Sequence, residues 1–440
     1  MAHDQQIISK IKDRTAVIGV IGLGYVGLPL MIRFGEEGFR TIGFDVDDSK
    51  VKRLNSGESY IKHIPSETIR QLRANDTFHA TSNYAALGEV DGILICVPTP
   101  LTSRREPDLS YIETTSDHIA ANLRKGQLIS LESTTYPGTT REILLPKLEN
   151  KGFAVGRDFF LVYSPEREDP GNPTYSTKNI PKVVGGITPA CTEAGKTLYE
   201  QIVDRVIAVT SPEAAEFSKL LENIFRSVNI ALVNELKMLA DKMGVDIWEV
   251  IEAASSKPFG FMPFYPGPGL GGHCIPIDPF YLSWKARELN FNTHFIELAG
   301  EVNTAMPEYV VAKIADTLNQ QGKSLKHARI LILGVAYKKD TDDIRESPGV
   351  EIINILKGKG AEVDYHDPHI PAFSGMRRYP HVAMERVELT EETLKYYDCA
   401  VIITNHSAYD YEWIVDNAQL VVDTRNATRD SKNRKKIIKA

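Results

Sequence analysis

The chain has 440 residues, of which 42% are hydrophobic and 25% charged, and its formal net charge is −7. This composition is typical of a globular protein of about two to three domains, and the acidic balance argues against nucleic acid or an anionic membrane as the main partner. The four cysteines have no paired spacing, which fits a reducing compartment without a disulfide framework. The apolar stretch 16–32 contains spaced glycines and Pro29. We therefore interpret it as neither a signal peptide nor a membrane span, and we expect a cytoplasmic protein.

A glycine-rich turn follows the first apolar run, 16–21, and precedes a helical stretch and a second strand, 39–44, that ends at Asp45. This order of strand, turn, helix, strand and acid is that of a dinucleotide-binding βαβ unit. The aspartate would bind ribose hydroxyls and repel a 2′-phosphate, which predicts NAD rather than NADP. The alternative is a glycine-rich turn without a ligand. The candidate cofactor-binding residues in the turn are Gly22, Gly24, Tyr25, Val26 and Gly27.

The α/β rhythm continues with expected strands at 92–97, 128–132, 159–163 and 183–185. Ligands of open α/β sheets bind beyond the carboxyl ends of the strands. Thr99, Thr134 and Glu166 follow three of these strands and are therefore candidate site residues, with Thr99 and Thr134 also expected near the cofactor. Threonines at such positions more commonly satisfy turn backbone. Cys96 lies inside an expected strand and is interpreted as core.

From Ser211 the pattern changes to apolar residues at three- and four-residue spacing, which predicts a helix to about Met243. A helix of this length usually bridges domains or builds an oligomer seam. Lys219 and Asn223 are one helical turn apart and share a face. A solvated face is the more common explanation of such a pair.

The stretch 261–281 is rich in Gly-Pro and Pro-Gly steps and contains Gly271, Gly272, Cys274 and Asp278. Proline and glycine exclude a helix or a central strand here, so we expect a loop that is costly to order. A thiol on such a loop is well placed to meet a ligand, and Asp278 is suited to orienting a water. A small buried thiol is an equally weighted alternative.

A polar stretch at 320–328 marks a boundary, after which strands are expected at 329–334, 362–366, 399–404 and 420–423. This second α/β domain lacks a glycine fingerprint. Its first loop carries Lys338, Lys339 and Arg345, so we expect a nucleotide whose phosphates meet basic side chains. The alternative is a mixed-charge surface loop. The basic tail 429–439 is expected to fray.

These parts suggest an oxidoreductase with covalent catalysis. NAD would take a hydride from an alcohol, a thiolate would attack the resulting aldehyde, and a second oxidation and hydrolysis would release an acid. Such chemistry needs a nucleophile, a base or water-orienting carboxylate, and a group that holds an oxyanion. Cys274, Glu166, Lys219, Asn223 and Asp278 are of the right types, although the sequence alone does not place them together.

With these motifs the chain closely resembles the UDP-glucose/GDP-mannose dehydrogenase family of nucleotide-sugar 6-dehydrogenases, over essentially its full length. The resemblance implies two Rossmann-like doubly wound α/β domains joined by a central helical domain. It implies an NAD-binding domain at 1–210, a dimerisation domain with the cysteine loop at 211–322, and a UDP-binding domain at 323–440. The motifs that carry it are Gly22–Gly27, Ser133-Thr134, Ser164–Glu166, Lys219 with Asn223, Gly271–Cys274 with Asp278, and Lys338–Asp340 with Arg345–Pro348.

The resemblance also implies roles for individual residues, and it implies no metal. Cys274 would be the nucleophile, and Lys219 with Asn223 would hold the oxyanion. The other expected roles are water handling by Asp278 and Thr134, acid/base work near the sugar by Glu166, substrate binding by Gly271 and Gly272, and contacts to phosphate or carboxylate by Lys338 and Arg345.

Two departures from the UDP-glucose branch, Ile277 before Asp278 and the segment Arg167–Gly171, resemble the branch that oxidises UDP-N-acetylhexosamines. We therefore expect UDP-N-acetylglucosamine as the substrate, with UDP-N-acetylmannosamine and then UDP-glucose as alternatives, and Arg167 near the acetamido group. The resemblance further implies a homodimer. Rivals from other classes are a non-catalytic nucleotide-sugar binding protein and a two-electron hydroxy-acid dehydrogenase.

Overall fold

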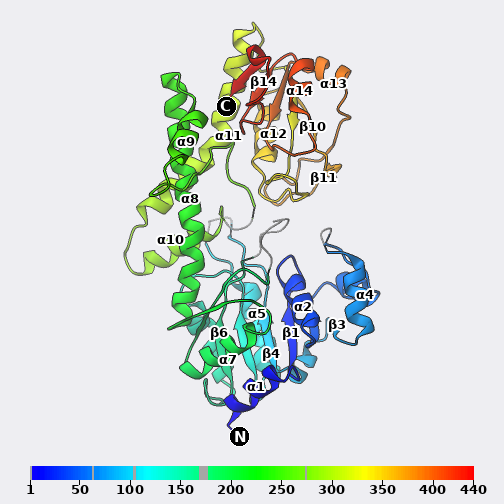
Figure 1. The fold of residues 1–440 in the computed structure, drawn as a ribbon, viewed down its shortest axis with the longest axis vertical. Helices are drawn as coiled ribbons and strands as arrows, with labels where there is room; N and C mark the ends of the chain where they lie inside the picture. The colour runs from blue at the N-terminus through cyan, green and yellow to red at the C-terminus, as the bar shows by residue number, and fades with distance from the viewer. Residues whose placement is uncertain (1, 62–63, 103–105, 168–176, 273–274) are drawn as a thin grey trace. The chain divides into compact units, whose positions relative to one another are not determined.

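The computed structural model describes the chain except for residues 1, 62–63, 103–105, 168–176 and 273–274 (Figure 1). It forms two compact units, one of Met1–Glu222 with Phe280–Phe291 and one of Asn223–Pro279 with Asn292–Ala440. The division falls inside two helices, α8 (Pro212–Met243) and α10 (Asp278–Glu288). No helix of the described residues is long and apolar enough to cross a membrane.

The N-terminal unit is built on an eight-stranded sheet of order β3-β2-β1-β4-β5-β6-β7-β8, in which every neighbouring pair is parallel except β6 with β7. Strands β4, β5 and β6 are buried along their whole length, which explains their continuous apolar sequence. The strands are β1 Val17–Ile21, β2 Arg40–Phe44, β3 Phe78–Thr81, β4 Gly92–Ile95, β5 Leu128–Leu131, β6 Phe160–Tyr163, β7 Lys182–Gly186 and β8 Val206–Val209.

Both faces of this sheet carry a hydrophobic core. Leu94 of β4 packs in one cluster with residues of α2 and α7, whereas Ile93 and Ile95 pack in a second cluster with residues of α5 and α6. The alternation follows from the two-residue period of a strand. It confirms the expected doubly wound layout. The helices of this unit are α1 His3–Lys12, α2 Gly27–Glu36, α3 Asp48–Asn55, α4 Ser66–Ala74, α5 Ser110–Asn122, α6 Leu145–Glu149 and α7 Pro189–Tyr199, with a π-helix at Thr140–Leu144 and a 3₁₀ turn at Tyr84–Glu89.

The C-terminal unit has its own parallel sheet of order β10-β9-β13-β14-β15. Ile330 and Ile332 of β9 face a core with residues of α11 and α12, and Leu331 and Leu333 face a core with residues of α14. The elements are α9 Ile247–Ser255, α11 His294–Gln320, β9 Arg329–Leu333, α12 Pro348–Gly358, β10 Glu362–His366, α13 Glu391–Tyr396, β13 Cys399–Ile402, α14 Tyr411–Asn417, β14 Val421–Asp423 and β15 Ile437–Lys439, with the short pair β11 Ala372–Phe373 and β12 Met384–Glu385 and a 3₁₀ turn at Arg434–Lys436.

Two expectations about local structure need correction. Cys96 directly follows β4 rather than lying within it, although it is partly buried and packs against the core as expected. The basic tail is not frayed: Ile437–Lys439 forms β15 against β14, and Lys439 pairs with Asp246 at 2.8 Å. Backbone pairing with a buried strand outweighs the repulsion among its basic side chains.

Candidate functional site

The three glycines of the first turn are required for three different reasons. Gly22 has φ of +91°, and a Cβ there would lie 2.6 Å from the Cys96 carbonyl oxygen. A Cβ on Gly27, the first residue of α2, would lie 1.9 Å from the Gly22 carbonyl oxygen. A Cβ on Gly24 would meet nothing within 4 Å. The open side of Gly24 leaves room for a diphosphate at the N-terminus of α2, as dinucleotide binding requires.

Asp45 at the end of β2 is buried beside this turn. Its carboxylate accepts hydrogen bonds from the backbone N–H groups of Leu23 and Asp47, both at 2.9 Å, and its ion pair with Lys50 spans 3.4 Å. These contacts tie the acid to the glycine turn and leave further lone pairs for ribose hydroxyls. An open glycine, the N-terminus of α2 and a fixed acid together fit NAD. Tyr25, 41% exposed, and Val26, the N-cap of α2, complete the turn.

The loops after β4 and β5 lie next to one another because these strands pair in parallel. The Ser133 hydroxyl donates to the Val97 carbonyl oxygen at 2.7 Å and ties the two loops together. Thr99 and Thr134 lie on these loops and are half-buried. The structure therefore places both candidate threonines at the carboxyl edge of the sheet, on neighbouring loops.

Glu166 belongs to a buried charge cluster. The Lys182 ammonium lies 3.0 Å from Glu166 Oε2 and 2.7 Å from Glu132 Oε2, and all three side chains are almost fully buried. Burial raises the pKa of Glu132. Burial alone would also raise the pKa of Glu166, but the Lys182 ammonium outweighs it and holds that pKa below its ordinary value. Sequence reasoning missed Lys182 and Glu132, because nothing in their local sequence marks them.

Lys219 does not lie on a solvated face. It is 9% exposed, and its ammonium donates to the Glu166 carbonyl oxygen at 2.8 Å. Arg167, the residue after Glu166, forms a bidentate ion pair with Glu222. Its Nε and Nη2 atoms lie 2.7 and 2.9 Å from the two carboxylate oxygens. The loop after β6 thus carries Glu166 and the paired Arg167, and α8 contributes the buried Lys219 beside them.

In the C-terminal unit, Asn223 and Asp278 are 1% and 4% exposed, and the Asn223 amide donates to the Asp278 carboxylate. Arg226 in turn donates to the Asn223 side-chain oxygen. Asp278 is the first residue of α10 rather than part of a loop turn. A buried carboxylate held by an amide in this way is suited to orienting a polar ligand or a water.

The glycine pair of the cysteine loop packs against the first loop of the second sheet. A Cβ on Gly271 or Gly272 would lie 2.7 or 2.8 Å from the Tyr337 side chain, and the Gly272 N–H donates to the Arg345 carbonyl oxygen at 3.1 Å. Two loops distant in sequence are therefore in contact, and the contact accepts only glycine. Cys274 lies outside the described residues.

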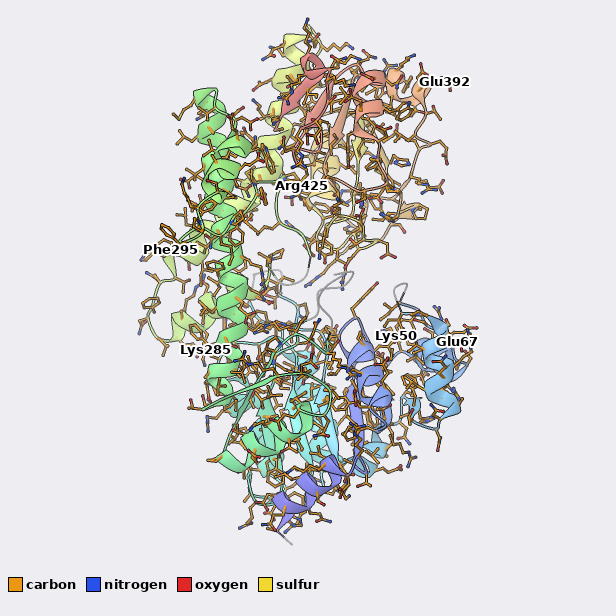
Figure 2. The ribbon with its side chains drawn as sticks, viewed as in Figure 1. Lys50, Glu67, Lys285, Phe295, Glu392 and Arg425 are labelled. Atoms are coloured by element: carbon orange, nitrogen blue, oxygen red, sulfur yellow. The ribbon has the colours of Figure 1, made fainter. Side chains whose placement is uncertain are left out.

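Three basic side chains lie on loops that follow strands of the second sheet. Arg345 forms an ion pair with Asp343, with its Nε 2.8 and 2.9 Å from the two carboxylate oxygens, and Lys338 is half-buried. Arg425, which sequence reasoning missed, follows β14 (Figure 2). Its guanidinium would lie 2.4 Å from a Cβ on Gly267, and burial lowers its pKa to about 10 although Asp423 opposes the change. Its position at a strand end was the only signal in the sequence.

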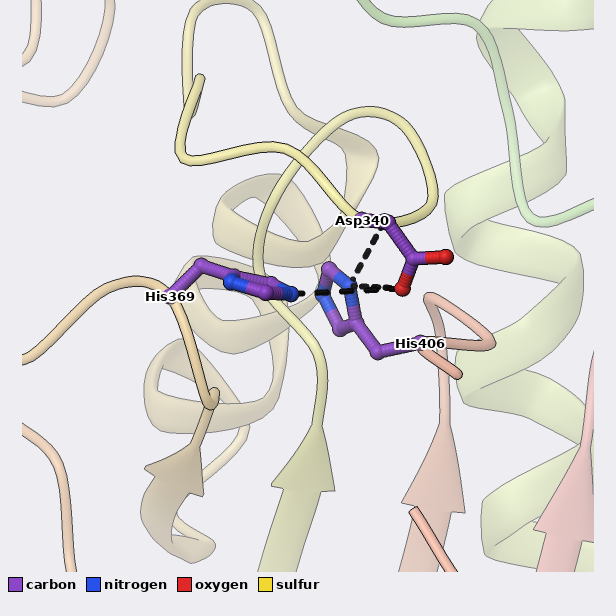
Figure 3. Close-up of side chains that lie close together, drawn as sticks. All are labelled: Asp340, His369 and His406. Carbon is purple, nitrogen blue, oxygen red and sulfur yellow. Dashed lines mark hydrogen bonds and ion pairs between the residues drawn. The ribbon is translucent and has the colours of Figure 1, made fainter. Parts of the chain in front are cut away.

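Among the described residues, one group has ligand atoms close enough together to hold a metal ion: Asp340, His369 and His406, within 4.8 Å of one another (Figure 3). However, His406 Nδ1 accepts a hydrogen bond from the Asp340 N–H at 2.9 Å, and an imidazole nitrogen has one lone pair. The Asp340 carboxylate accepts from the Ser407 N–H and hydroxyl. Both ring nitrogens of His406 are engaged in hydrogen bonds, so this residue offers no lone pair to an ion, and we assign the group no metal.

The N-terminal unit combines a glycine turn suited to a dinucleotide with buried acids and a buried lysine at the carboxyl edge of the same sheet. This combination is that of a nicotinamide-dependent oxidoreductase of the Rossmann type. Comparison with known proteins makes the class specific. Models of the UDP-glucose/GDP-mannose dehydrogenase family match in chain order, the NAD binding domain over 16–203, the central domain over 213–305 and the UDP binding domain over 331–430.

Similar proteins support the same assignment. UDP-N-acetyl-D-glucosamine 6-dehydrogenase of Pseudomonas aeruginosa is 35% identical over 82% of this chain and 85% of its own. UDP-N-acetyl-D-mannosamine dehydrogenase of Pyrococcus horikoshii is 34% identical over 94% and 96%. A solved structure of the Pyrococcus horikoshii UDP-D-ManNAc dehydrogenase has a TM-score of 0.87 at 30% identity, covering 96% of this chain and 98% of that one.

The chain belongs to the UDP-glucose/GDP-mannose dehydrogenase family. It is an NAD-dependent UDP-sugar dehydrogenase, which confirms the expected enzyme class and cofactor.

Proposed function

We propose that this enzyme oxidises C6 of UDP-N-acetylglucosamine to the carboxylate, using two NAD per sugar and a thioester on Cys274, to supply a surface polysaccharide. The proposed oxidation chemistry rests on two contacts of Glu166 inside the N-terminal unit. Its carboxylate pairs with Lys182, and its backbone carbonyl oxygen accepts a hydrogen bond from Lys219. This arrangement supplies an ionised carboxylate and a cation in a dry environment, where both act strongly on developing charge.

The proposed roles of the residues follow the chemistry of the substrate carbon. NAD, when bound at the glycine turn, supplies a hydride acceptor. The Cys274 sulfur bonds to the C6 aldehyde, and the oxygen that becomes negative is held by Lys219 and Asn223. After the second oxidation, water held by Asp278 and Thr134 displaces the thiolate from the thioester and leaves the acid.

The C-terminal unit is proposed to hold the UDP part of the substrate. Lys338 and Arg425 are the cations suited to its diphosphate, because each is partly withdrawn from water. Arg425 lies against Gly267, and Tyr337, the residue before Lys338, packs against Gly271 and Gly272. Gly271 and Gly272 allow that loop to approach closely. Arg345 is proposed to act through its pair with Asp343, which shapes the same loop.

The sugar is proposed from two sequence features and one relative. Ile277 and the segment after Glu166 are those expected of the N-acetylhexosamine branch, and the Pseudomonas aeruginosa relative has UDP-N-acetyl-D-glucosamine in its name. Arg167, already oriented by Glu222, is proposed to reach the acetamido carbonyl. An Arg167→Ala enzyme with full activity and an unchanged KM would remove this role.

Product stoichiometry tests the assignment. The purified enzyme is incubated with NAD and, separately, UDP-GlcNAc, UDP-ManNAc and UDP-glucose, and NADH is counted per sugar consumed. Two NADH per UDP-GlcNAc is the expected result. Two per UDP-ManNAc would move the substrate to the one named for the Pyrococcus horikoshii relative. One NADH per sugar, or a Cys274→Ser enzyme with unchanged NADH yield, would remove the thioester.

We also propose a homodimer whose seam includes helix α8. In its second half, large apolar side chains remain exposed at helical spacing, and an exposed apolar stripe of this kind usually marks an interaction surface. Phe295 at the start of α11 is 77% exposed as well (Figure 2). The exposed large apolar residues of α8 in this unit are Phe225, Leu232, Leu236, Leu239 and Met243.

A further inference from the structure

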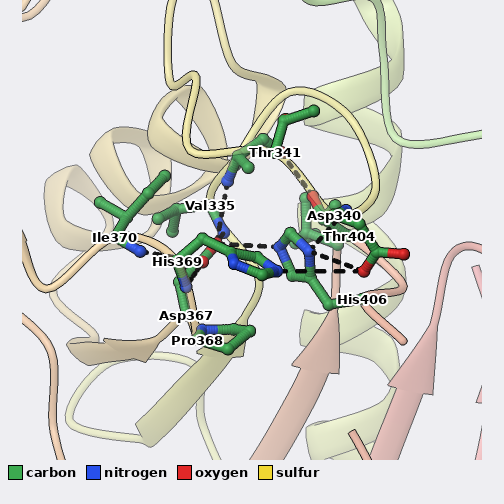
Figure 4. Close-up of polar contacts among 12 residues, drawn as sticks. Val335, Asp340, Thr341, Asp367, Pro368, His369, Ile370, Thr404 and His406 are labelled. Carbon is green, nitrogen blue, oxygen red and sulfur yellow. Dashed lines mark hydrogen bonds and ion pairs between the residues drawn. The ribbon is translucent and has the colours of Figure 1, made fainter. Parts of the chain in front are cut away.

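Three loops of the C-terminal unit meet at one buried carboxylate, Asp367 (Figure 4). They follow β9, β10 and β13, which are neighbours in the sheet, with β10 at its edge. The loop after β9 carries Lys338, whose side chain is half-buried. The contacts among these loops therefore determine where the basic loop of the UDP binding domain lies.

Asp367 is fully buried and accepts hydrogen bonds at both oxygens. Oδ2 accepts from the N–H groups of Val335 and Ala336 at 2.8 and 3.1 Å, and Oδ1 accepts from those of His369 and Ile370 at 2.8 and 3.2 Å. Burial alone would raise the pKa of Asp367, but the hydrogen bond from His406 and the backbone N–H groups outweigh it and lower that pKa. The carboxylate is therefore ionised and can only accept.

The ionised carboxylate determines the tautomer of His406, which is also fully buried. His406 Nε2 lies 3.1 Å from Asp367 Oδ2, so Nε2 carries the proton and donates it. Nδ1 then has a lone pair, which accepts the Asp340 backbone N–H at 2.9 Å (Figure 3). One imidazole thus connects the buried carboxylate to the far end of the basic loop.

Both ends of the loop are bound to the β13 loop by further contacts. The Thr404 hydroxyl donates to the Ala336 carbonyl oxygen at 2.6 Å, and the Ser407 N–H and hydroxyl donate to the Asp340 carboxylate at 2.7 Å each. Asp340 has φ of +58°, a conformation that a non-glycine residue keeps only when its surroundings hold it. Lys338 lies between these two anchored ends.

We propose that His406 is a positioning residue that pre-orders the Lys338 loop for the substrate diphosphate. The inference rests on the proposed contact between Lys338 and that diphosphate. Without the acceptor at Nδ1, Asp340 loses the bond that fixes its backbone, and the loop must be ordered when the ligand binds. The ordering of a few side chains and backbone units costs enough to weaken binding by about tenfold.

Two replacements of His406 separate its two hydrogen bonds. His406→Gln keeps a donor near the Nε2 position and loses the Nδ1 acceptor, whereas His406→Asn keeps an acceptor near Nδ1 and loses the donor. His381→Gln is the matched control, because His381 is exposed in the same unit and its ring makes one hydrogen bond, to the Asn354 side chain. Ser407→Ala, at an exposed position, removes one anchor without opening the core.

The experiment measures UDP binding by calorimetry, together with the KM for the UDP-sugar, the KM for NAD, and kcat. We expect His406→Gln to weaken UDP about tenfold and to raise the UDP-sugar KM equally, with kcat and the NAD KM within about twofold, and His406→Asn to recover most of the loss. Ser407→Ala should weaken UDP about threefold. The losses of His406→Gln and Lys338→Ala should be non-additive, because one residue acts through the other.

UDP affinity within about twofold of wild type in both folded His406→Gln and Ser407→Ala would overturn the proposal. If His406→Gln does not fold, Ser407→Ala alone decides. If the wild-type enzyme binds UDP but oxidises none of the UDP-sugars, the proposed substrate is wrong, whereas the binding test of His406 still applies. Wild-type enzyme that binds no UDP would overturn both.

Discussion

Replacing Lys182 with Met should move the acid limb of the pH–activity profile to higher pH. Lys182 pairs with Glu166 and Glu132 at 3.0 and 2.7 Å in a buried environment. Breaking a buried ion pair costs about 3–5 kcal/mol, and one pKa unit corresponds to about 1.4 kcal/mol. Because the two contacts are of similar length, we divide the loss equally, which leaves about 1.5–2.5 kcal/mol for the stabilisation of the Glu166 carboxylate.

The sign follows from the cation. With Lys182 present the pKa of Glu166 is lowered, so activity that needs its carboxylate is lost only as the pH falls below the ordinary carboxyl range. Without Lys182, burial raises that pKa, and activity is lost at a higher pH on acidification. In the wild type the ionised Glu166 contributes stability above its unfolded pKa, and this contribution is lost as the pH falls through the lowered folded pKa; the Lys182→Met protein lacks it.

The assay is the initial rate of NADH formation across the pH range, with the UDP-sugar that the wild-type enzyme oxidises. Glu132→Gln is the matched control, because it leaves Lys182 to Glu166 alone, and its acid limb should not move to higher pH. A Lys182→Met enzyme that is folded, shown by its circular dichroism, and keeps the wild-type acid limb would refute the reasoning. Glu166 would then have no part in the proton transfers.

Four further predictions concern other parts of the chain. Burial raises the pKa of Glu216 to about 7, although the backbone N–H of Gly138 opposes it. Since this value lies above the unfolded carboxyl value of about 4.3, the unfolding free energy should increase by about 1.3 kcal/mol between pH 8 and pH 6 through this group, and denaturant titration of Glu216→Gln should show that increment removed. Asp45→Asn should raise the KM for NAD about tenfold and reduce the preference for NAD over NADP, both measured by steady-state kinetics. An unchanged preference would show that Asp45 does not bind the ribose. Leu236→Glu should convert the proposed dimer to monomer in sedimentation at micromolar concentration, whereas Glu235→Ala should not, and a dimer in both would place the seam elsewhere. Arg425→Gln should weaken UDP about tenfold or more in calorimetry while NAD binding is unchanged, and equal loss of both would indicate misfolding instead.

Elements with strong local signals could be predicted from the sequence. The strand of β10, Glu362–His366, and the long helix α8 follow the expected ranges closely, because periodicity and caps are local properties. Strands β3 and β8 were not expected, since each is only four residues long and includes exposed positions. A short edge strand carries little of the apolar pattern from which a strand is recognised.

The residues of the candidate site also differ in whether local sequence reveals them. The glycine turn with Asp45 is recognisable because the cofactor requires specific residues at fixed local spacing. Lys182, by contrast, becomes the partner of Glu166 only because β7 runs antiparallel beside β6. Arg425 lies beside Gly267, although more than 150 residues separate them in the sequence. Such pairs depend on strand order, which no single stretch of sequence contains.

The ionisation of Glu166 constrains the order of events in the proposed reaction. Oxidation of an alcohol to a carboxylate with two NAD releases one proton at the alcohol step, one when the thiohemiacetal is oxidised and one when water opens the thioester. A buried carboxylate that Lys182 keeps ionised can accept these protons but has none to donate, so Glu166 is better suited to the role of base than of acid. Glu132, whose pKa burial raises, lies on the other side of the same ammonium. A proton accepted at Glu166 would therefore weaken its hold on Lys182 and leave that ammonium paired with Glu132 alone.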